Sequence, residues 1–391
     1  MGGAFAAFGP LSIRSLSGRE GSAPLLFSLY SLAAAAGAVL AGRLMDRLGR
    51  RPGLVGGYVL MSAAGLLAFV AVRGDRPGLL LVSGAVLGAG AAAALLGRAA
   101  VADMHPPERR GRAVGLLVAA GTVGAVGGPL LAGAVHALAE RLGMARPLAA
   151  PWLLLAGLAL IGAGLVAAIR PDPRDLAAPG SGRSGPARRP SEIFRLRPAA
   201  TALVSMGVAQ AVMVTFMAQL PPTVHQHGAS ELTVSLVVSV HLAGMFAFSP
   251  LFGGVIDRWG RRVGLLLGAL LSAAGVSLGL VDPGALPVGA ALLLIGMGWS
   301  AAYLASTAVV SDLAAPSERA RALGVTDLVA ALSAGGGTLG GAFLVGSAGL
   351  VALGAAGLAL LAVPIALLVP LREPSPGRWP TEARRTANPP V

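Results

Sequence analysis

The sequence has 391 residues, of which 55% are hydrophobic and only 12% are charged. A soluble fold of this length would need an unusually large dry core, so the composition favours a polytopic membrane protein. The formal net charge is +13 and cysteine is absent, which excludes disulfides, and the Arg residues lie between apolar runs rather than on one basic domain, which argues against a nucleic-acid partner.

Apolar runs separated by charged or Pro/Gly-rich turns follow one another along the chain. A membrane-spanning helix needs about 20 apolar residues. The first run, Met1 to Leu16, is shorter and carries Arg14, so we expect the first helix to be short or truncated. The other predicted spans cover residues 24–44, 53–72, 78–101, 113–136, 151–169, 198–220, 231–256, 263–281, 285–310, 322–344 and 347–371.

Two segments lack such runs. Residues 170–197 are polar and rich in Pro and Gly, which predicts a linker between two halves, residues 1–169 and 198–371. Residues 372–391 predict a disordered tail. Most of the 30 basic residues, all of them Arg, fall on the side that holds the linker and the tail. The positive-inside rule makes this side cytoplasmic, and both termini lie there if the first helix spans.

A charged loop is repeated in the two halves. Residues 41–54 read AGRLMDRLGRRPGL, and residues 252–265 read FGGVIDRWGRRVGL. The shared residues are Gly42, Asp46, Arg47, Gly49 and Arg50 in the first copy, and Gly253, Asp257, Arg258, Gly260 and Arg261 in the second. This repetition indicates that the chain is a duplicated bundle.

A second signature returns in the same order. Residues 101–115 read VADMHPPERRGRAVG, and residues 310–324 read VSDLAAPSERARALG. Asp103 corresponds to Asp312, and Arg112 to Arg321. The Glu-Arg pairs also align Arg109 with Arg319.

The pattern G-x-x-x-D-R-x-G-R-R resembles the loop between the second and third helices of the major facilitator superfamily, which has a second copy between helices eight and nine. The resemblance spans nearly the whole chain. It implies an all-α polytopic membrane protein with twelve transmembrane helices in two pseudo-symmetric six-helix halves. It also implies a multi-pass protein of the cell (inner or plasma) membrane that binds a small-molecule substrate in the lipid bilayer and works as a monomer.

In that family the Asp of the first loop caps the start of helix eleven when the cytoplasmic side is closed. Carried over, Asp46 would face the helix that begins near Arg321, and Arg50 and Asp103 would complete a charge network. The equivalent network would contain Asp257, Arg261, Asp312 and Arg112. A carboxylate at a helix N-terminus gains about 0.3–1 kcal/mol, so a gating role is physically reasonable. The alternative is that these Arg residues only set the topology.

The fifth predicted span carries a glycine pattern that resembles the signature of drug:proton antiporters, the multidrug efflux branches. Its residues are Gly115, Gly124, Gly128, Pro129 and Gly133. Pro129 removes one backbone hydrogen bond, so the helix can bend there. The alternative is an ordinary glycine-rich packing face.

One feature departs from those antiporters. They place an Arg in helix four, in a pattern where this chain has Gly84, Leu87 and Gly88. Arg98 lies nearer the cytoplasmic end of the same span. It could substitute for the missing Arg, or its side chain could extend to the membrane interface.

Ionisable residues inside membrane spans are costly and are therefore functional candidates. His241 and Asp327 are the candidates for proton coupling. The repeat places His241 opposite Tyr30, which suggests a shared cavity wall. The alternatives are a neutral His bonded between helices and an Asp that pairs with a gate Arg.

Helices one, four, seven and ten line the substrate cavity in this superfamily. The seventh span places Met206, Gln210, Met213 and Met217 on one face, and the tenth places Trp299 and Tyr303 one turn apart. Flexible Met and flat aromatic side chains with few charges suit hydrophobic, variable ligands. Contact with lipid or ordinary packing is the alternative for any one of these Met residues.

The sequence thus predicts a secondary active transporter that exports small, mainly hydrophobic compounds by alternating access, using a proton gradient and no cofactor. The alternatives are an uptake carrier or facilitator for a small metabolite, and a membrane receptor or scaffold that transports nothing. No nucleophile–base pair, metal-ligand spacing or ATP-binding loop occurs, so no catalytic residue, metal or enzymatic activity is predicted.

Overall fold

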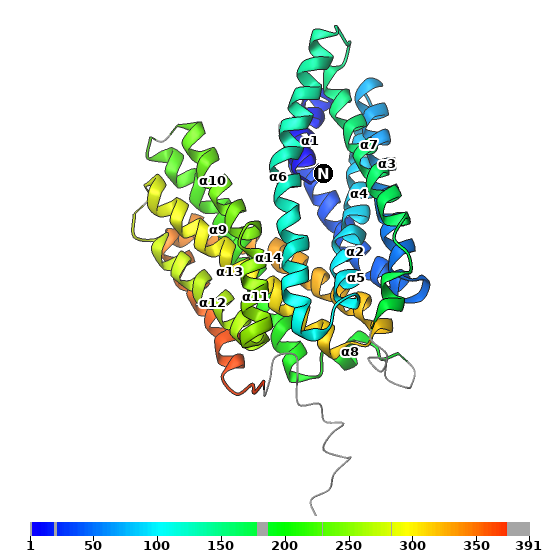
Figure 1. The fold of residues 1–391 in the computed structure, drawn as a ribbon. Coiled ribbons are helices and arrows are strands. Elements are labelled where there is room, and N and C mark those ends of the chain that lie inside the picture. Colours follow the sequence, from blue (N-terminus) through cyan, green and yellow to red (C-terminus); the bar gives the residue numbers. More distant parts are fainter. Residues whose placement is uncertain (1, 19–21, 178–186, 229, 283, 374–391) are drawn as a thin grey trace, which may run out of the picture. The chain divides into compact units, whose positions relative to one another are not determined.

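The computed structural model describes residues 2–18, 22–177, 187–228, 230–282 and 284–373, and these residues form helices and no strand (Figure 1). The predicted tail beyond residue 373 and residues 178–186 of the predicted linker lie outside the described residues.

The helices of the first half of the sequence are α1 (Gly2–Ser17), α2 (Ser22–Leu48), α3 (Arg50–Arg73), α4 (Pro77–Leu95), α5 (Gly97–Asp103), α6 (Arg110–Arg141) and α7 (Ala150–Ala167). Three short 3-10 helices lie beside them, η1 (Pro107–Arg109), η2 (Pro147–Ala149) and η3 (Pro173–Leu176). The second half holds α8 (Pro190–Ile193), α9 (Arg197–Gln226), α10 (Glu231–Phe246), α11 (Ser249–Trp259), α12 (Arg261–Leu278), α13 (Ala285–Leu313) and α14 (Pro316–Leu368).

Ten helical stretches among the described residues are long and apolar enough to cross a membrane. One of them is α14, in which two helices are joined at Gly349, where φ is +80°. Counting both parts of α14 and adding the shorter α1, which has 16 residues, gives the twelve helices that the sequence predicts. The prediction of an all-α polytopic membrane protein is therefore confirmed.

Contacts divide the chain into two compact units. Unit 1 comprises Met1–Met104, Ala120–Ser181 and Pro316–Leu328, and unit 2 comprises His105–Ala119, Gly182–Ala315 and Val329–Val391. Each unit therefore holds the helices of one half of the sequence together with the first turns of one helix from the other half. The first turns of α14 belong to unit 1, and the first turns of α6 belong to unit 2. The half boundaries at residues 169 and 198 stay predictions.

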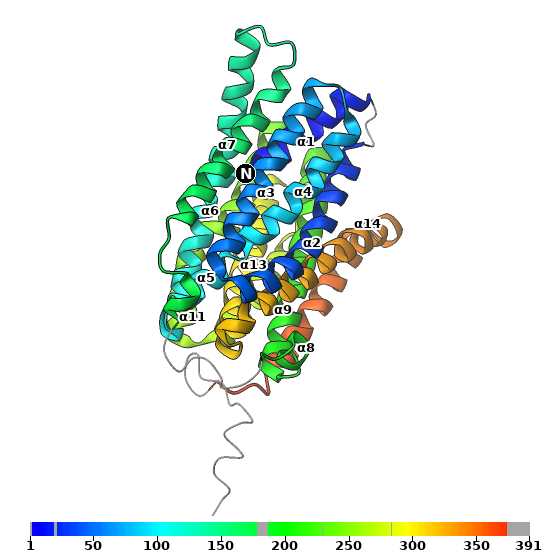
Figure 2. The same cartoon turned by 90° about the vertical axis from the view of Figure 1, so that its right-hand side faces the viewer.

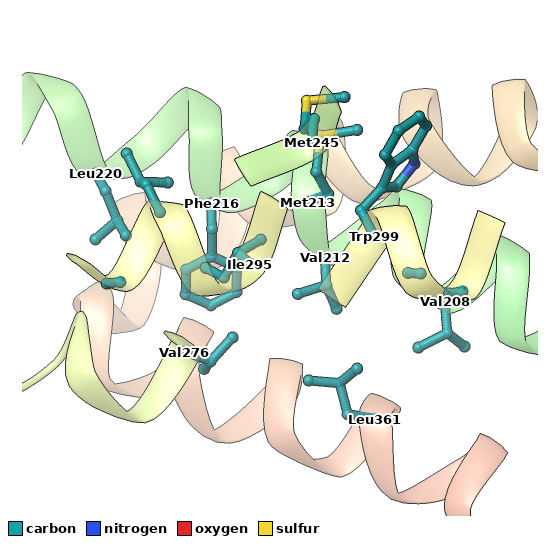
Figure 3. Packing of buried hydrophobic residues seen from close by; sticks show 14 of the residues in the cluster. Val208, Val212, Met213, Phe216, Leu220, Met245, Val276, Ile295, Trp299 and Leu361 are labelled. Carbon is teal, nitrogen blue, oxygen red and sulfur yellow. The ribbon is translucent and has the colours of Figure 1, made fainter. Parts of the chain in front are cut away.

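Within unit 1, α4 packs against both α2 and α3, and α7 packs against α3 (Figure 2). Within unit 2, α13 packs against α9, α10 and α12. Its core contains Phe216 from α9, Ile295 from α13, Val276 from α12 and Leu361 from α14 (Figure 3). Large aliphatic side chains also point outward, as Leu286 does with 85% of its surface exposed, which fits a protein whose outer face meets lipid.

Candidate functional site

Asp46, near the end of α2, contacts the first two turns of α14. Its Oδ1 accepts a hydrogen bond from the backbone N–H of Ala320 at 3.1 Å, and its Oδ2 accepts one from the backbone N–H of Arg321 at 2.9 Å. Oδ1 also accepts a hydrogen bond from Nη1 of Arg50 at 2.7 Å. One carboxylate thus binds both a helix start and a buried cation, and such charge-assisted bonds are stronger than neutral ones. The helix begins at Pro316, earlier than the predicted span start at residue 322.

Arg50 is fully buried and lies at the centre of this network. Its Nε donates to Oδ2 of Asp103 at 2.7 Å, and its Nη2 donates to the backbone carbonyl of Pro316. Nη1 of Arg319 also donates a hydrogen bond to Oδ1 of Asp103. Asp103 is therefore shared by two buried guanidinium groups. We name Asp46, Arg50, Asp103, Arg319 and Arg321 the first charge network.

The second copy of the loop makes equivalent contacts within unit 2. Asp257, in α11, accepts hydrogen bonds from the backbone N–H groups of Gly111 and Arg112, both at 2.8 Å. These residues lie in the first turn of α6, where backbone N–H groups lack partners inside the helix. Nη1 of Arg261 lies 3.7 Å from Oδ1 of Asp257. Asp257 thus caps α6 as Asp46 binds α14.

Arg261 and Asp312 complete this second arrangement. Nε of Arg261 donates to Oδ2 of Asp312 at 2.9 Å, and Nη1 of Arg110 donates to Oδ1 of the same carboxylate at 2.6 Å. The Nη2 of Arg261 donates to the backbone carbonyl of Pro107. We name Asp257, Arg261, Asp312, Arg110 and Arg112 the second charge network.

Two features of these networks differ from what the alignment of the two sequence repeats predicts. Arg110, and not the exposed Arg109, occupies the position equivalent to Arg319. The side chains of Arg47 and Arg258 are exposed and stay outside the networks, and the guanidinium of Arg258 lies 5.9 Å from the ring centre of Trp259. Arg110 and Arg319 are thus additional site residues. The available signal was that each lies seven residues after the repeated aspartate, Asp103 or Asp312.

Glycine is required where α2 meets α14 and where α11 meets α6. A Cβ atom at Gly42 would lie 2.6 Å from the carbonyl oxygen of Ala320, and one at Gly253 would lie 2.7 Å from Cα of Arg112. Distances this short are essentially never found for a real Cβ. Both loops therefore need a residue without a side chain for the carboxylate to reach its helix.

Two further carboxylates, which the sequence analysis did not single out, cap the helices that follow the loops. Oδ1 of Asp172 accepts a hydrogen bond from the backbone N–H of Arg50 at 3.0 Å, and its Oδ2 accepts one from Arg51 at 2.9 Å. In the second copy, Oε2 of Glu373 accepts a hydrogen bond from the backbone N–H of Arg262 at 2.9 Å. α3 and α12 therefore each begin at a carboxylate that lies after the last span of the same half.

The glycines of the loops make room for these caps. Gly49 has a φ of +109° and Gly260 a φ of +100°, which L side chains rarely adopt. A Cβ at Gly49 would lie 2.5 Å from Oδ2 of Asp172, and one at Gly260 would lie 2.6 Å from Oε2 of Glu373. Gly49 and Gly260 therefore have two roles. Each adopts the positive φ that the turn requires, and each leaves space for the carboxylate that caps the next helix.

The cap changes the acidity of Asp172. Partial burial raises its pKa, but hydrogen bonds from the backbone N–H groups of Arg174, Arg51 and Arg50 and the charge of Arg174 together lower it by more. The pKa of Asp172 therefore lies below its ordinary value, and the carboxylate is ionised at neutral pH.

Arg98, in α5, pairs with Asp327 from the first part of α14. Its Nη2 donates to Oδ1 of Asp327 at 2.6 Å and to the carbonyl of Leu323 at 3.3 Å. The Arg98 side chain is 1% exposed, so its charge is buried inside unit 1. Oδ2 of Asp327 is buried and has no hydrogen-bond partner among the described residues. The Asp327 carboxylate therefore keeps one buried oxygen without a partner among those residues, beside the positive charge of Arg98.

His241 and Tyr30 lie in different units. His241, in α10, is fully buried, and its Nδ1 donates to the carbonyl of Leu292 in α13 at 2.8 Å. A carbonyl only accepts, so Nδ1 carries the hydrogen and Nε2 is the free acceptor, with no partner among the described residues. Tyr30 stacks on Phe5, with ring centres 4.9 Å apart.

Among the candidate cavity residues of unit 2, Trp299 contacts both Gln210 and Tyr303. Nε1 of Trp299 donates to Oε1 of Gln210 at 2.7 Å, and the Trp299 ring stacks on Tyr303 with centres 5.0 Å apart. Met206 and Met213 are buried in the core beside them, whereas Met217 is half-buried. We name Gln210, Phe246, Trp299 and Tyr303 the aromatic–amide cluster.

The glycine pattern of the fifth predicted span lies in α6. A Cβ at Gly115 would lie 2.5 Å from the carbonyl of Ser249, so this glycine is a close helix contact. Gly124 and Gly133 differ, because a Cβ there would meet no neighbouring atom within 4 Å. Pro129 lies inside the helix between them. A tightly packed glycine face therefore does not describe these two positions. Among the described residues, no group of three or more His, Asp or Glu is placed to hold a metal ion.

A comparison with known proteins decides to which family this duplicated loop belongs. The sequence model of the Major Facilitator Superfamily matches residues 1–222 and 202–391. The chain belongs to the Major Facilitator Superfamily. It is thus a multi-pass membrane protein of a family of transporters.

Relatives within this superfamily cover most of the chain. The uncharacterised MFS-type transporter YddS of Bacillus subtilis (strain 168) is 32% identical over 384 residues, which is 93% of this chain and 86% of YddS. The riboflavin transporter RfnT of Brucella anthropi is 28% identical over 327 residues, which is 83% of this chain and 80% of RfnT.

Solved structures of the superfamily have the same fold. The E. coli fucose:proton symporter FucP matches with a TM-score of 0.74 at 17% identity, over 94% of this chain and 93% of FucP. The human organic anion transporter MFSD10 matches with a TM-score of 0.72 at 19% identity, over 89% of this chain and 83% of MFSD10.

Proposed function

We propose that this superfamily member is a secondary active transporter that exports small, mainly hydrophobic compounds by alternating access, driven by proton flow into the cell. It needs no cofactor beyond the proton gradient. We further propose that it lies in the cell membrane as a monomer with both termini in the cytoplasm.

The observation that carries proton coupling is the pair of Arg98 and Asp327. Both lie inside stretches that can span the membrane, where an ionisable group is costly and is retained for a function. Asp327 keeps one buried oxygen without a partner, and a proton on this carboxylate would weaken its attraction to Arg98. Arg98 itself stays charged, so the acid is the member of the pair that can carry the proton.

Alternating access is supported by the two charge networks. Each consists of a carboxylate on the loop, a buried Arg and a helix start, and each is made of contacts that can form or break as one set. This arrangement supports a gating role for Asp46 and Asp257. Arg50, Arg261, Asp103 and Asp312 hold the two carboxylates in place.

Export is supported by the glycine pattern in α6, which resembles that of the drug:proton antiporters. Gly124 and Gly133 make no close helix contact, and Pro129 lies between them. A helix with an interior Pro and no side chains on these positions can change its bend at low cost.

The test is fluorescent-dye uptake into inverted membrane vesicles, with and without a protonophore. We expect dye to accumulate in vesicles that carry the protein and the protonophore to abolish this accumulation. Asp327→Asn is expected to abolish the gradient-driven accumulation but to retain exchange of dye across the membrane. Dye accumulation that is unchanged both by the protonophore and by Asp327→Asn would refute proton coupling.

An uptake carrier or facilitator for a small metabolite is the second candidate. It is favoured by the absence of the helix-four Arg, where the chain has Gly84, Leu87 and Gly88, and by the relative named as a riboflavin transporter. Riboflavin accumulation in energised cells that express the chain separates the two directions. Net uptake above vector controls would support this candidate, and dye efflux without riboflavin uptake would support export.

A further inference from the structure

We propose that the aromatic–amide cluster of unit 2 is a binding site for a flat, conjugated ring compound that carries a carbonyl oxygen at its edge. This inference rests on the proposed transport function, because it names the class of compound that the transporter would carry.

The orientation of the Gln210 amide is the first step. The two ends of a Gln amide look alike, but the indole N–H of Trp299 is only a donor, so the atom that it meets at 2.7 Å is the amide oxygen. The amide nitrogen therefore points away from Trp299. It makes no hydrogen bond to any described residue, and it is not among the buried atoms that lack a partner. Its N–H groups are thus both unused and accessible.

The position of Gln210 within its helix indicates the surroundings of those N–H groups. The residue lies in the middle of α9 (Arg197–Gln226), a stretch that is long enough to span the membrane. Hydrocarbon offers no acceptor, so an unsatisfied amide there is energetically costly. The accessible side of Gln210 therefore faces water or a polar atom of a ligand rather than lipid tails.

The aromatic side chains supply the second half of the site. Trp299 and Tyr303, one turn apart on α13, are stacked at an interplanar angle of 19°, and Phe246 of α10 meets Trp299 edge-on at 77°. Tyr303 and Phe246, which both contact Trp299, are only partly buried, so part of their surface is accessible. A planar ring is the shape that gains most from stacking on such a surface.

Methionine side chains form part of the core around Trp299. They are Met206, Met213 and Met245. Figure 3 shows Trp299, Met213 and Met245 directed to the same side of this core. Flexible thioether side chains adapt to ligands of different outline. The site therefore selects for flatness and a hydrogen-bond acceptor, and tolerates variation elsewhere.

Direct binding to the purified protein tests this inference apart from transport. The probe is tritiated 9-fluorenone, a flat ketone, with two unlabelled competitors. Fluorene has the same flat rings without the carbonyl, and dicyclohexyl ketone has the carbonyl without flat rings. We expect fluorenone to compete about two- to tenfold better than fluorene, as one hydrogen bond predicts, and dicyclohexyl ketone to compete least. Equal competition by all three would overturn the inference without any variant.

Variants then assign the contacts. Trp299→Leu is expected to weaken fluorenone binding about three- to tenfold, through lost stacking. Gln210→Glu, assayed at pH 8, keeps an oxygen for Trp299 but removes the N–H donor, so the preference for fluorenone over fluorene is expected to disappear. Phe343→Leu is the matched control, because this aromatic residue of α14 is 76% exposed and lies outside the cluster. Unchanged preference in Gln210→Glu would overturn the assignment of the donor.

Dye flux in the same variants separates the two proposals. The expected binding pattern without any gradient-driven flux would refute export and keep the site. Gradient-driven flux with unaltered fluorenone binding in Trp299→Leu would refute the site and keep export.

Discussion

The backbone N–H of Arg321 donates a hydrogen bond of 2.9 Å to the carboxylate of Asp46, on a helix far away in the sequence. The other oxygen of this carboxylate accepts a hydrogen bond from Arg50 at 2.7 Å. A single charge thus holds both a helix start and a buried cation, and its removal affects both at once.

Asp46→Asn is expected to lower the transport rate about five- to thirtyfold. The physical reason is the loss of about 1–2 kcal/mol from the state in which α2 contacts α14. Dye flux at matched protein level is the measurement. Arg47→Gln is the control, since Arg47 lies on the same loop and its side chain is exposed. Equal flux in Asp46→Asn and wild type would contradict a gating role.

Arg98→Met is expected to destabilise the folded protein by about 3–5 kcal/mol, because it leaves the carboxylate of Asp327 buried without its counter-ion. The measurement is the unfolding temperature in detergent. Adding Asp327→Leu to Arg98→Met should restore most of the lost stability. A double variant as unstable as the single one would show that the two side chains do not act as a pair.

His241→Ala is expected to shift the pH dependence of transport. Nδ1 of His241 is engaged by the carbonyl of Leu292, so Nε2 is the ring atom that remains to accept a proton. Initial rates of dye flux between pH 5.5 and about 8.5 span the range where a His titrates. A parallel profile with a uniformly lower rate would assign His241 to packing between α10 and α13.

Asp172→Ala is expected to lower the unfolding temperature at neutral pH and to have little effect in acid. The folded-state pKa of Asp172 lies below its unfolded value of about 3.9, so the carboxylate stabilises the fold above that value. The contribution is lost as the pH falls through the folded-state pKa. Unfolding temperatures of wild type and variant should therefore converge below about pH 4.

Asp175→Ala is the control for this cap, since Asp175 lies in η3, the 3-10 helix that follows Asp172, and its side chain is exposed. A difference between wild type and Asp172→Ala that stays constant with pH would assign the effect to something other than the charge.

Gly42→Ala is expected to impair transport more than a small substitution usually does. Its Cβ would lie 2.6 Å from the carbonyl of Ala320 and 2.8 Å from Cα of Arg321, so α2 and α14 would have to separate. Gly56→Ala is the control, because a Cβ there meets no atom within 4 Å. Similar flux in the two variants would show that the close approach at Gly42 is not needed.

The overall fold could be predicted from the sequence, because long apolar runs and a duplicated loop can be recognised from the order of the residues alone. The residues that the loop repeats, such as Asp46 and Asp257, also lie where the resemblance implies. Arg110 was missed because Glu-Arg pairs align Arg109 with Arg319, whereas the helical turn brings Arg110 to Asp312.

Other contacts depend on distances that the chain order does not reveal. Asp172 and Glu373 share only a following Pro, and only the folded chain brings them to the starts of α3 and α12. The bond between Gln210 and Trp299 joins two helices whose rotation about their axes is set by packing in unit 2.

Asp103, in α5, is shared by Arg50 from α3 and Arg319 from α14, and both partners are guanidinium groups. A single carboxylate thus joins three helices of unit 1. A substitution that removes the charge of Asp103 therefore loosens α3 and α14 from α5 in one step, whereas Arg50 keeps its contact with Asp46.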